Sequence, residues 1–133
     1  MLQVLIINGM YPDYEKNEMV KANIGMQDGK IAYIGAETPE ARQVIDAEGR
    51  VVSPGFIDIH MHEEDFVHEG KQFVIANMML EMGVTTAVGG NCGVQKQPLS
   101  VFKSVLNELG GSPVNYLILA GYNHFRTELG IGR

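Results

Sequence analysis

The sequence has a single cysteine and few basic side chains, and each shortage excludes a class of protein. The single cysteine, Cys92, rules out an intramolecular disulfide and leaves a thiol that is structural, reactive or bound to a metal. Lysine and arginine number 10 against 16 aspartates and glutamates, which gives a formal net charge of -6. Such a chain has no basic field to attract phosphate backbones or an anionic membrane, so we expect neither nucleic acid nor a membrane as its partner.

Long apolar runs and targeting signals are also missing. No stretch approaches the roughly 20 apolar residues that a helix needs to cross a bilayer. The apolar run at residues 4–7 has no basic segment before it and no small-residue cleavage site after it, so we expect a cytoplasmic protein. With 133 residues, of which 45% are hydrophobic and 20% charged, the composition is that of a soluble globular chain.

Residues 1–52 have the pattern of a small β-rich unit. A β-branched run at residues 2–7 ends in Asn8-Gly9, which predicts a strand that stops there. Polar and apolar residues alternate over 20–26 before Asp28-Gly29, a pair typical of β-hairpin turns. Further short strands are predicted at 31–34, 44–45 and 50–52.

The pattern changes after Pro54-Gly55, where strand-like and helix-like segments alternate. Apolar residues at helical spacing predict helices at about 70–82 and 98–109, the first ending at Gly83 and the second at Gly110-Gly111. Strands are predicted at 56–60, 84–88 and 114–120. The alternation is typical of βα units and a parallel sheet. These units are too few to close a barrel of eight, so we expect strand edges without partners.

Two histidines at the end of the strand predicted at 56–60 carry the strongest chemical signal. A strand sends residues i and i+2 to the same side, so His60 and His62 can hold one ion, with Asp58 one step back on that face as a supporting carboxylate. Neutral imidazole is a good zinc ligand and leaves positions for water and further ligands. A bare His-x-His pair is, by itself, more often an ordinary surface feature.

The second signal is the loop after the strand predicted at 84–88, where Gly89-Gly90 and Gly93 flank Cys92. Glycines let such a loop approach a ligand closely, and a thiolate is a strong zinc ligand. A free cysteine is often just a buried small apolar residue. If this strand is the second of a barrel, however, its carboxyl end lies on the same rim as His60 and His62.

Two strings of residues resemble a known family. Pro-Gly-Phe-Ile-Asp-x-His-x-His at 54–62 resembles the entry into the first barrel strand of the amidohydrolase superfamily. Gly-Val-Thr-Thr-x-Val-x-Gly-Asn-Cys-Gly at 83–93 is similar to its D-aminoacylase branch, the N-acyl-D-amino-acid deacylases. The resemblance implies that His60, His62 and Cys92 bind one or two Zn2+ ions, with the cysteine in a bridging place.

The resemblance also implies an α/β fold. Residues 1–52 would form the β-rich part of a small sandwich domain, and residues 53–133 the N-terminal βα units of an incomplete (β/α)8 barrel of a metal-dependent hydrolase. On this reading the chain is an N-terminal fragment.

Residues 114–126 look like the third strand of the same branch, which usually ends in Gly-His-x-x-Leu-Arg. Here Tyr122 stands where the histidine is usual and His124 follows two residues later, whereas Arg126 matches. An arginine at the rim can pair bidentately with a substrate carboxylate, and an exposed salt-bridging arginine fits the pattern equally well.

In the complete enzyme that the resemblance implies, zinc assists hydrolysis of the amide bond of N-acyl-D-amino acids. The remaining ligands and a proton-transferring aspartate would come from later strands, so we expect no catalytic residue in this chain and no activity from it alone. Two alternatives stay open: a dihydroorotase-like cyclic amidase or deaminase, and a non-catalytic metal-binding remnant that forms a homo-oligomer or swapped dimer.

Three acidic residues follow the histidine pair directly. Because a run of acids in a loop is usually solvated, we expect Glu63, Glu64 and Asp65 to lie in water. His68 is expected at the start of the following helix without a catalytic role.

Overall fold

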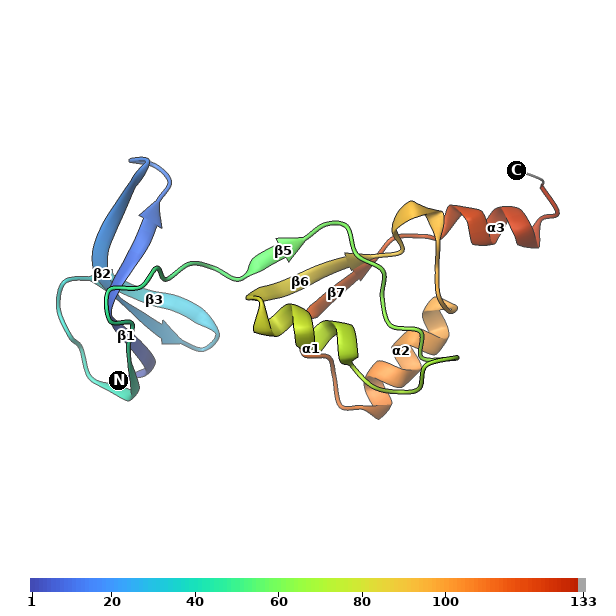
Figure 1. Ribbon diagram of the computed structural model, residues 1–133. Coiled ribbons are helices and arrows are strands. Elements are labelled where there is room, and N and C mark those ends of the chain that lie inside the picture. Colours follow the sequence, from blue (N-terminus) through green and yellow to red (C-terminus); the bar gives the residue numbers. More distant parts are fainter. Residues whose placement is uncertain (132–133) are drawn as a thin grey trace. The chain divides into compact units, whose positions relative to one another are not determined.

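The computed structural model of the protein describes residues 1–131, except for the side chain of His124. The chain divides into two compact units, Met1–Pro54 and Gly55–Arg133, and each has a sheet of its own (Figure 1). Among the described helices, none combines the length and apolar character needed to cross a membrane.

Unit 1, defined as Met1–Pro54, is a mixed four-stranded sheet. Its strands are β1 (Leu2–Asp13), β2 (Glu18–Gln27), β3 (Lys30–Gly35) and β4 (Ala41–Asp46). The order is β3-β2-β1-β4, with β1 antiparallel to β2 and parallel to β4. Leu5 of β1 and Ile24 of β2 are buried, so the long central pair of strands carries the core of this unit.

The turn between β2 and β3 is the predicted hairpin. Asp28 and Gly29 connect the strands with φ angles of 51° and 71°. Two successive positive φ angles define the turn whose twist matches that of the flanking strands, and Asp-Gly is a preferred pair for it. The hairpin prediction is therefore confirmed.

The sequence had indicated that β1 ends at the Asn8-Gly9 pair. In the structure this pair instead forms a bulge within β1. Asn8 has a φ of 57°, and the register between β1 and β2 shifts between Ile6 and Gly9. The Asn8 amide donates to Oδ1 of Asn23 at 3.0 Å, and the Asn8 side chain donates to Asp46 at 3.1 Å. These bonds satisfy the backbone and side chain of the extra residue, so the strand continues to Asp13.

Unit 2, defined as Gly55–Arg133, is built around a three-stranded parallel sheet with the order β5-β6-β7. The strands are β5 (Phe56–Asp58), β6 (Val84–Gly89) and β7 (Asn115–Ile118). The helices are α1 (Val74–Glu81), the single-turn η1 (Asn91–Gly93), α2 (Leu99–Glu108) and α3 (Tyr122–Glu128). The alternation of strands and helices confirms the predicted α/β class.

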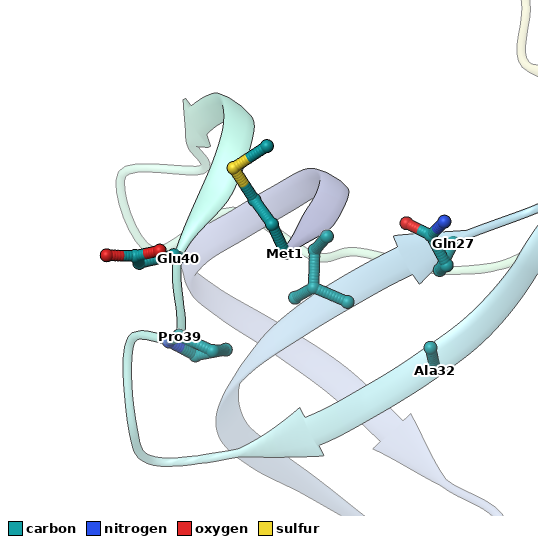
Figure 2. A pocket seen from close by; sticks show the side chains of 6 residues that line it. Met1, Gln27, Ala32, Pro39 and Glu40 are labelled. Atoms are coloured by element: carbon teal, nitrogen blue, oxygen red, sulfur yellow. The ribbon is translucent and has the colours of Figure 1, made fainter.

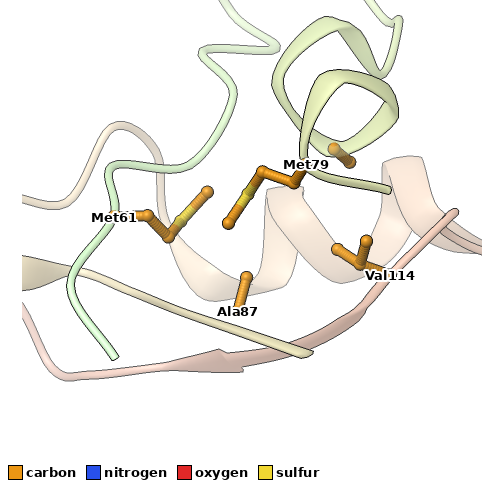
Figure 3. Close-up of a cluster of buried hydrophobic side chains, with 5 residues drawn as sticks. Met61, Met79, Ala87 and Val114 are labelled. Atoms are coloured by element: carbon orange, nitrogen blue, oxygen red, sulfur yellow. The ribbon is translucent and has the colours of Figure 1, made fainter. Parts of the chain in front are cut away.

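Two apolar clusters join helices α1 and α2 to the sheet. In the first, Met79 of α1 points toward Ala87 of β6, and Met61 and Val114 complete the contact (Figure 3). The second cluster consists of Phe66, Phe102 and Val105. Tyr116 of β7 packs against both clusters, so α1 and α2 cover the same face of the sheet.

Several predicted boundaries in unit 2 were too wide. β5 ends at Asp58 instead of residue 60, and α1 begins at Val74 instead of residue 70. Between them lies a long loop, residues 59–73, which is held by buried polar side chains described below. Helix α3 was not predicted, because residues 114–126 were assigned wholly to a strand and its end.

The two outer strands of this sheet, β5 and β7, each pair with β6 alone among the described strands. Phe56 and Ile57 of β5 and Leu117 of β7 are exposed. This matches the expectation that so few βα units leave strand edges and apolar side chains without partners.

Candidate metal centre

His60, His62 and Cys92 form a cluster in unit 2. Their potential ligand atoms all lie within 4.8 Å of one another, and all three side chains are exposed. The Sγ atom of Cys92 lies 3.4 Å from Nε2 of His60. The two histidine rings are 6.2 Å apart between centroids, with their planes at 72°. The structure thus brings together the three residues that the sequence singled out as metal ligands.

The donor set and its spacing fit a zinc ion. Zinc takes imidazole nitrogen at about 2.0–2.1 Å and thiolate sulfur at about 2.3 Å in tetrahedral geometry, which places a nitrogen and a sulfur ligand about 3.5 Å apart. The separation of 3.4 Å between His60 and Cys92 matches this value. Because the side chains are exposed, a fourth position would open to solvent.

The cluster lies in the loops that follow β5 and β6. These strands are parallel neighbours, so their carboxyl ends meet at one edge of the sheet, where barrel enzymes build their sites. The prediction that His60 and His62 share a face of a strand was wrong, because β5 ends at Asp58 and both histidines lie in the loop beyond it.

Cys92 has a backbone conformation that is unusual for a residue with a side chain. Its φ is 58°, and its neighbours Gly90 and Gly93 also have positive φ angles of 73° and 69°. A left-handed conformation costs a residue with a Cβ roughly 1–2 kcal/mol. Such strain persists only where the surroundings fix it, and it is concentrated at functional sites.

The side-chain amides of Asn91 and Asn123 donate three hydrogen bonds to the backbone around Cys92. The Asn91 side chain donates to the carbonyl of Val88 at 2.6 Å and to that of Met61 at 3.3 Å. The Asn123 side chain, from α3, donates to the carbonyl of Cys92 at 3.1 Å. Helix α3 therefore contributes to the position of the cysteine, a role that the sequence had not indicated.

Gly90 lies close to the backbone that follows β7. A Cβ added there would lie 2.2 Å from the carbonyl oxygen of Leu119, the residue after β7. Any side chain at this position would force the loop away from β7.

Asp58 supports the histidine loop through the backbone. Its Oδ1 accepts a hydrogen bond from the backbone N–H of His60 at 2.9 Å. This contact fixes the direction in which the chain leaves β5, two residues before the second histidine.

Glu63 and Glu64 are buried, which corrects the prediction that they face solvent. Only 2% of Glu63 and 4% of Glu64 is exposed. The two carboxylates accept hydrogen bonds from distant parts of unit 2, which compensates for the loss of hydration. Their place directly after the histidine pair was the only signal in the sequence, and it did not reveal these partners.

Glu64 connects α1 to β7. Its Oε1 accepts from the backbone N–H of Ala76 at 2.8 Å, and its Oε2 accepts from the hydroxyl of Tyr116. Burial and this carboxylate together raise the pKa of Tyr116 above its ordinary value, so its hydroxyl stays protonated as a donor. The buried Gln97 completes the group, since its side chain donates to the carbonyl of Glu64 at 2.9 Å and accepts from the amide of Phe66 at 3.0 Å.

Asp65 and His68 form a local pair at the other end of the acidic run. Nδ1 of His68 lies 2.9 Å from Oδ1 of Asp65. Burial raises the pKa of Asp65, but hydrogen bonds from His68 outweigh it and hold that pKa below its ordinary value. His68 was expected at the start of the following helix, but α1 begins only at Val74, so His68 lies in the loop before it. It is not among the three residues of the described metal cluster.

Arg126, the residue predicted to bind a substrate carboxylate, lies on α3 and not at a strand end. Its guanidinium carbon lies 5.5 Å from the centroid of the Tyr122 ring. Arg126 is three residues after Asn123, so the two share a face of the helix. The side chain of His124 lies outside the described residues.

A hollow in unit 1 is lined by Met1, Leu2, Gln27, Ala32, Pro39 and Glu40 (Figure 2). Its volume is about 410 Å³. Glu40 is its single titratable side chain, so this hollow lacks the convergent chemical groups found around Cys92.

Comparison with known proteins shows which family the chain resembles. Residues 43–127 match the amidohydrolase family. The D-aminoacylase of Alcaligenes xylosoxydans xylosoxydans is 33% identical over 98 residues, which is 73% of this chain and 20% of that protein. The adenine deaminase of Listeria innocua is 39% identical over 85 residues, which is 64% of this chain and 14% of that protein.

A solved structure shares the fold. The N-acyl-D-glutamate deacylase of Bordetella bronchiseptica, complexed with zinc and a phosphonate inhibitor, superposes with a TM-score of 0.75 at 28% identity. The match covers 94% of this chain and 30% of that chain. The fold is therefore that of part of a (β/α)8 amidohydrolase with its β-rich leader, and the resemblance to the D-aminoacylase branch is confirmed. The chain belongs to the amidohydrolase family.

Proposed function

We propose that His60, His62 and Cys92 hold zinc in an enzyme that hydrolyses the amide bond of N-acyl-D-amino acids. The observation that carries the proposal is the placement of the Cys92 thiol 3.4 Å from the His60 imidazole, with His62 in the same cluster. A related deacylase was solved with zinc, which supports the choice of metal. The number of ions that the site holds, one or two, is open to measurement.

Each residue has a distinct task in this proposal. Bound zinc supplies Lewis acidity toward the amide carbonyl and an acidified water. His60 and His62 hold the ion, Cys92 adds a thiolate, and Asp58 fixes the direction of the histidine loop through the His60 amide. Arg126 is the candidate to receive the substrate carboxylate, because its planar guanidinium binds carboxylates in a bidentate manner.

The proposal extends to the organisation of the whole protein. Residues 1–52 would form the β-rich part of a sandwich domain, and residues 53–133 the N-terminal part of a barrel. The chain spans 20% of the length of the D-aminoacylase and 30% of the solved deacylase. We therefore expect the 133 residues alone to bind metal without turning over substrate.

A second candidate is deamination, because the adenine deaminase of Listeria innocua is 39% identical over its matched part. Cys92 distinguishes deacylation from deamination. The resemblance of residues 83–93 to the D-aminoacylase branch includes Cys92, and this favours deacylation.

Metal binding is the first test. Zinc bound per chain is measured by equilibrium dialysis and elemental analysis, on the wild type and on Cys92→Ala and His60→Ala. Loss of a ligand should weaken binding by more than the roughly 10–100-fold that loss of an outer partner costs. His68→Ala is the matched control, since this histidine pairs with Asp65 outside the cluster and its loss should leave the affinity unchanged. Equal affinity in Cys92→Ala and the wild type would exclude the proposed site.

The substrate class is tested on the native protein purified from its source. Peptide mass spectrometry establishes whether the native chain continues past Arg133, and the same preparation is assayed with N-acetyl-D-amino acids, their L-enantiomers and adenine. Release of acetate from the D-enantiomers supports deacylation. Ammonia release from adenine would establish the deaminase instead.

A further inference from the structure

Glu63 joins the two loops that carry the metal-binding cluster. It directly follows His62, and only 2% of it is exposed. Its Oε2 accepts from the backbone N–H of Gly90 at 2.8 Å, and its Oε1 accepts from the backbone N–H of Lys96 at 3.1 Å. One carboxylate therefore holds both ends of segment 90–96, in which Cys92 lies.

The surroundings are shaped to receive this carboxylate. A Cβ added at Gly89 would lie 2.8 Å from Oε2 of Glu63 and 3.0 Å from Cδ1 of Ile118. The absence of a side chain at Gly89 thus gives the carboxylate access to the backbone of the cysteine loop. Both of its oxygens are used by amide donors, which offsets the cost of burying it.

We propose that Glu63 is a positioning residue for the metal centre, which keeps the Cys92 thiol in register with His60 and His62. This inference rests on the proposed function, because it concerns the same site. The strain at Cys92 gives it a physical basis: a residue with a φ of 58° needs its flanking chain fixed, and Glu63 fixes it at both ends.

Glu64 provides a matched control. It is the neighbouring residue, is equally buried, carries the same formal charge and also accepts two hydrogen bonds. Its partners, however, are the amide of Ala76 and the hydroxyl of Tyr116, outside the cysteine loop. Glu63→Gln and Glu64→Gln therefore remove the same charge with the same change of shape, and they differ in which contacts they weaken.

The first experiment measures amide hydrogen exchange in the full chain without metal. Glutamine replaces one acceptor oxygen with an NH2 group, which cannot accept from an amide donor. In Glu63→Gln we expect exchange at Gly90 or Lys96 to rise about tenfold or more, with Ala76 unchanged. In Glu64→Gln we expect exchange to rise at Ala76 and to stay unchanged at Gly90 and Lys96. Unchanged exchange at both Gly90 and Lys96 in Glu63→Gln would overturn the inference.

The second experiment uses Co2+ as a spectroscopic probe. Ligation by Cys92 produces a thiolate-to-metal charge-transfer absorption, and Cys92→Ala provides the spectrum without it. Glu63→Gln should lower the intensity of this band and weaken Co2+ binding by about 10–100-fold, whereas Glu64→Gln should retain the band. Gly89→Ala displaces the Glu63 carboxylate without replacing it. It should therefore reproduce the effect of Glu63→Gln on the band and on Co2+ affinity. If Glu63→Gln does not fold, Gly89→Ala alone tests the inference.

The outcomes separate the two proposals. A wild-type chain without the thiolate band would overturn the proposed function and this inference with it. A wild-type band that persists at full intensity and affinity in both Glu63→Gln and Gly89→Ala would overturn this inference alone. A band lost in Glu63→Gln and in Glu64→Gln alike would show that charge, and not the contact with segment 90–96, governs the site.

Discussion

Units 1 and 2 differ in the burial of their carboxylates. In unit 1, Asp13 accepts from the amide of Glu15, two residues away, and the exposed Asp46 accepts from the amide of Glu48 and from the side chain of Asn8 in the neighbouring strand. In unit 2, Glu63 reaches Gly90 and Lys96, which are 27 and 33 residues along the chain. Asp13 and Asp46 hold turns and one pair of neighbouring strands, whereas the buried Glu63 joins two separate loops of unit 2. The geometry of the candidate metal centre therefore depends on residues that are not ligands.

The largest effect that we expect concerns the apolar core of unit 2. Phe102→Ala should lower the free energy of unfolding of unit 2 by about 3–5 kcal/mol, because a fully buried aromatic leaves a cavity. Hydrogen exchange of the β6 amides measures this stability. Phe56→Ala removes the same side chain at an exposed position and should cost far less. Equal losses would mean that unit 2 is no better packed around Phe102 than at its surface.

The next effect separates backbone strain from steric contact in the cysteine loop. Gly90 and Gly110 have φ angles of 73° and 77°, so alanine at either position incurs a similar strain, about 1 kcal/mol. A Cβ at Gly90 also meets the Leu119 carbonyl, whereas one at Gly110 meets no atom within 4 Å. Gly90→Ala should therefore cost about 1–3 kcal/mol more than Gly110→Ala and weaken zinc binding, as thermal unfolding and metal titration can establish.

Tyr116 tests the long-range contacts of the buried carboxylates. Tyr116→Phe removes the hydroxyl that donates to Glu64 and should destabilise unit 2 by about 1–3 kcal/mol in urea unfolding, because it leaves a buried acceptor without its partner. Tyr14→Phe, at a residue that is 79% exposed, should be nearly neutral. A neutral Tyr116→Phe would show that Glu64 finds another donor.

The same tyrosine predicts a dependence on alkaline pH. Its pKa in the folded chain is raised above the ordinary 10.0 by burial and by Glu64. A group with a raised folded pKa contributes its full stability below the unfolded pKa and loses it as pH rises toward the folded value. We expect the stability of unit 2 to fall as pH rises above about 10, and Tyr116→Phe to reduce that slope.

The smallest effect should come from a carboxylate of unit 1. Hydrogen bonds from the Glu48 amide and the Asn8 side chain hold the pKa of Asp46 below its ordinary 3.8. A depressed pKa adds stability above the unfolded value, and this is lost as pH falls through the folded value. Asp46→Asn should therefore lower the stability slightly at neutral pH, where the ionised carboxylate is stabilising, and flatten the acid limb of the unfolding profile below about pH 4. An unchanged acid limb would show that Asp46 does not contribute to the loss of stability in acid.

How well a feature could be predicted depends on how far apart in the sequence the residues that determine it lie. The Asp28-Gly29 turn and the ends of α2 are set by neighbouring residues, and the sequence predicted them. The cluster of His60, His62 and Cys92 was predicted because two short motifs resemble a family.

Features determined over long distances were missed. Asn8-Gly9 has the composition of a turn, but it forms a bulge because Asn23 and Asp46 supply partners from other parts of the sheet. Glu63 and Glu64 look like solvated acids until their partners, up to 52 residues away, are known. Helix α3 is a local feature that was missed for a different reason, because residues 114–126 were assigned wholly to a strand and its end.

The carboxylate that holds both ends of segment 90–96 also makes this segment a closed ring with fixed attachment points. The entropy of closing such a ring grows only slowly with the number of residues in it. In the metal centre that we propose, a substitution of Cys92 would change the donor atom while the attachment points at Gly90 and Lys96 stay in place. The proposed site would therefore tolerate the exchange of one metal-binding atom for another, by natural variation or by design.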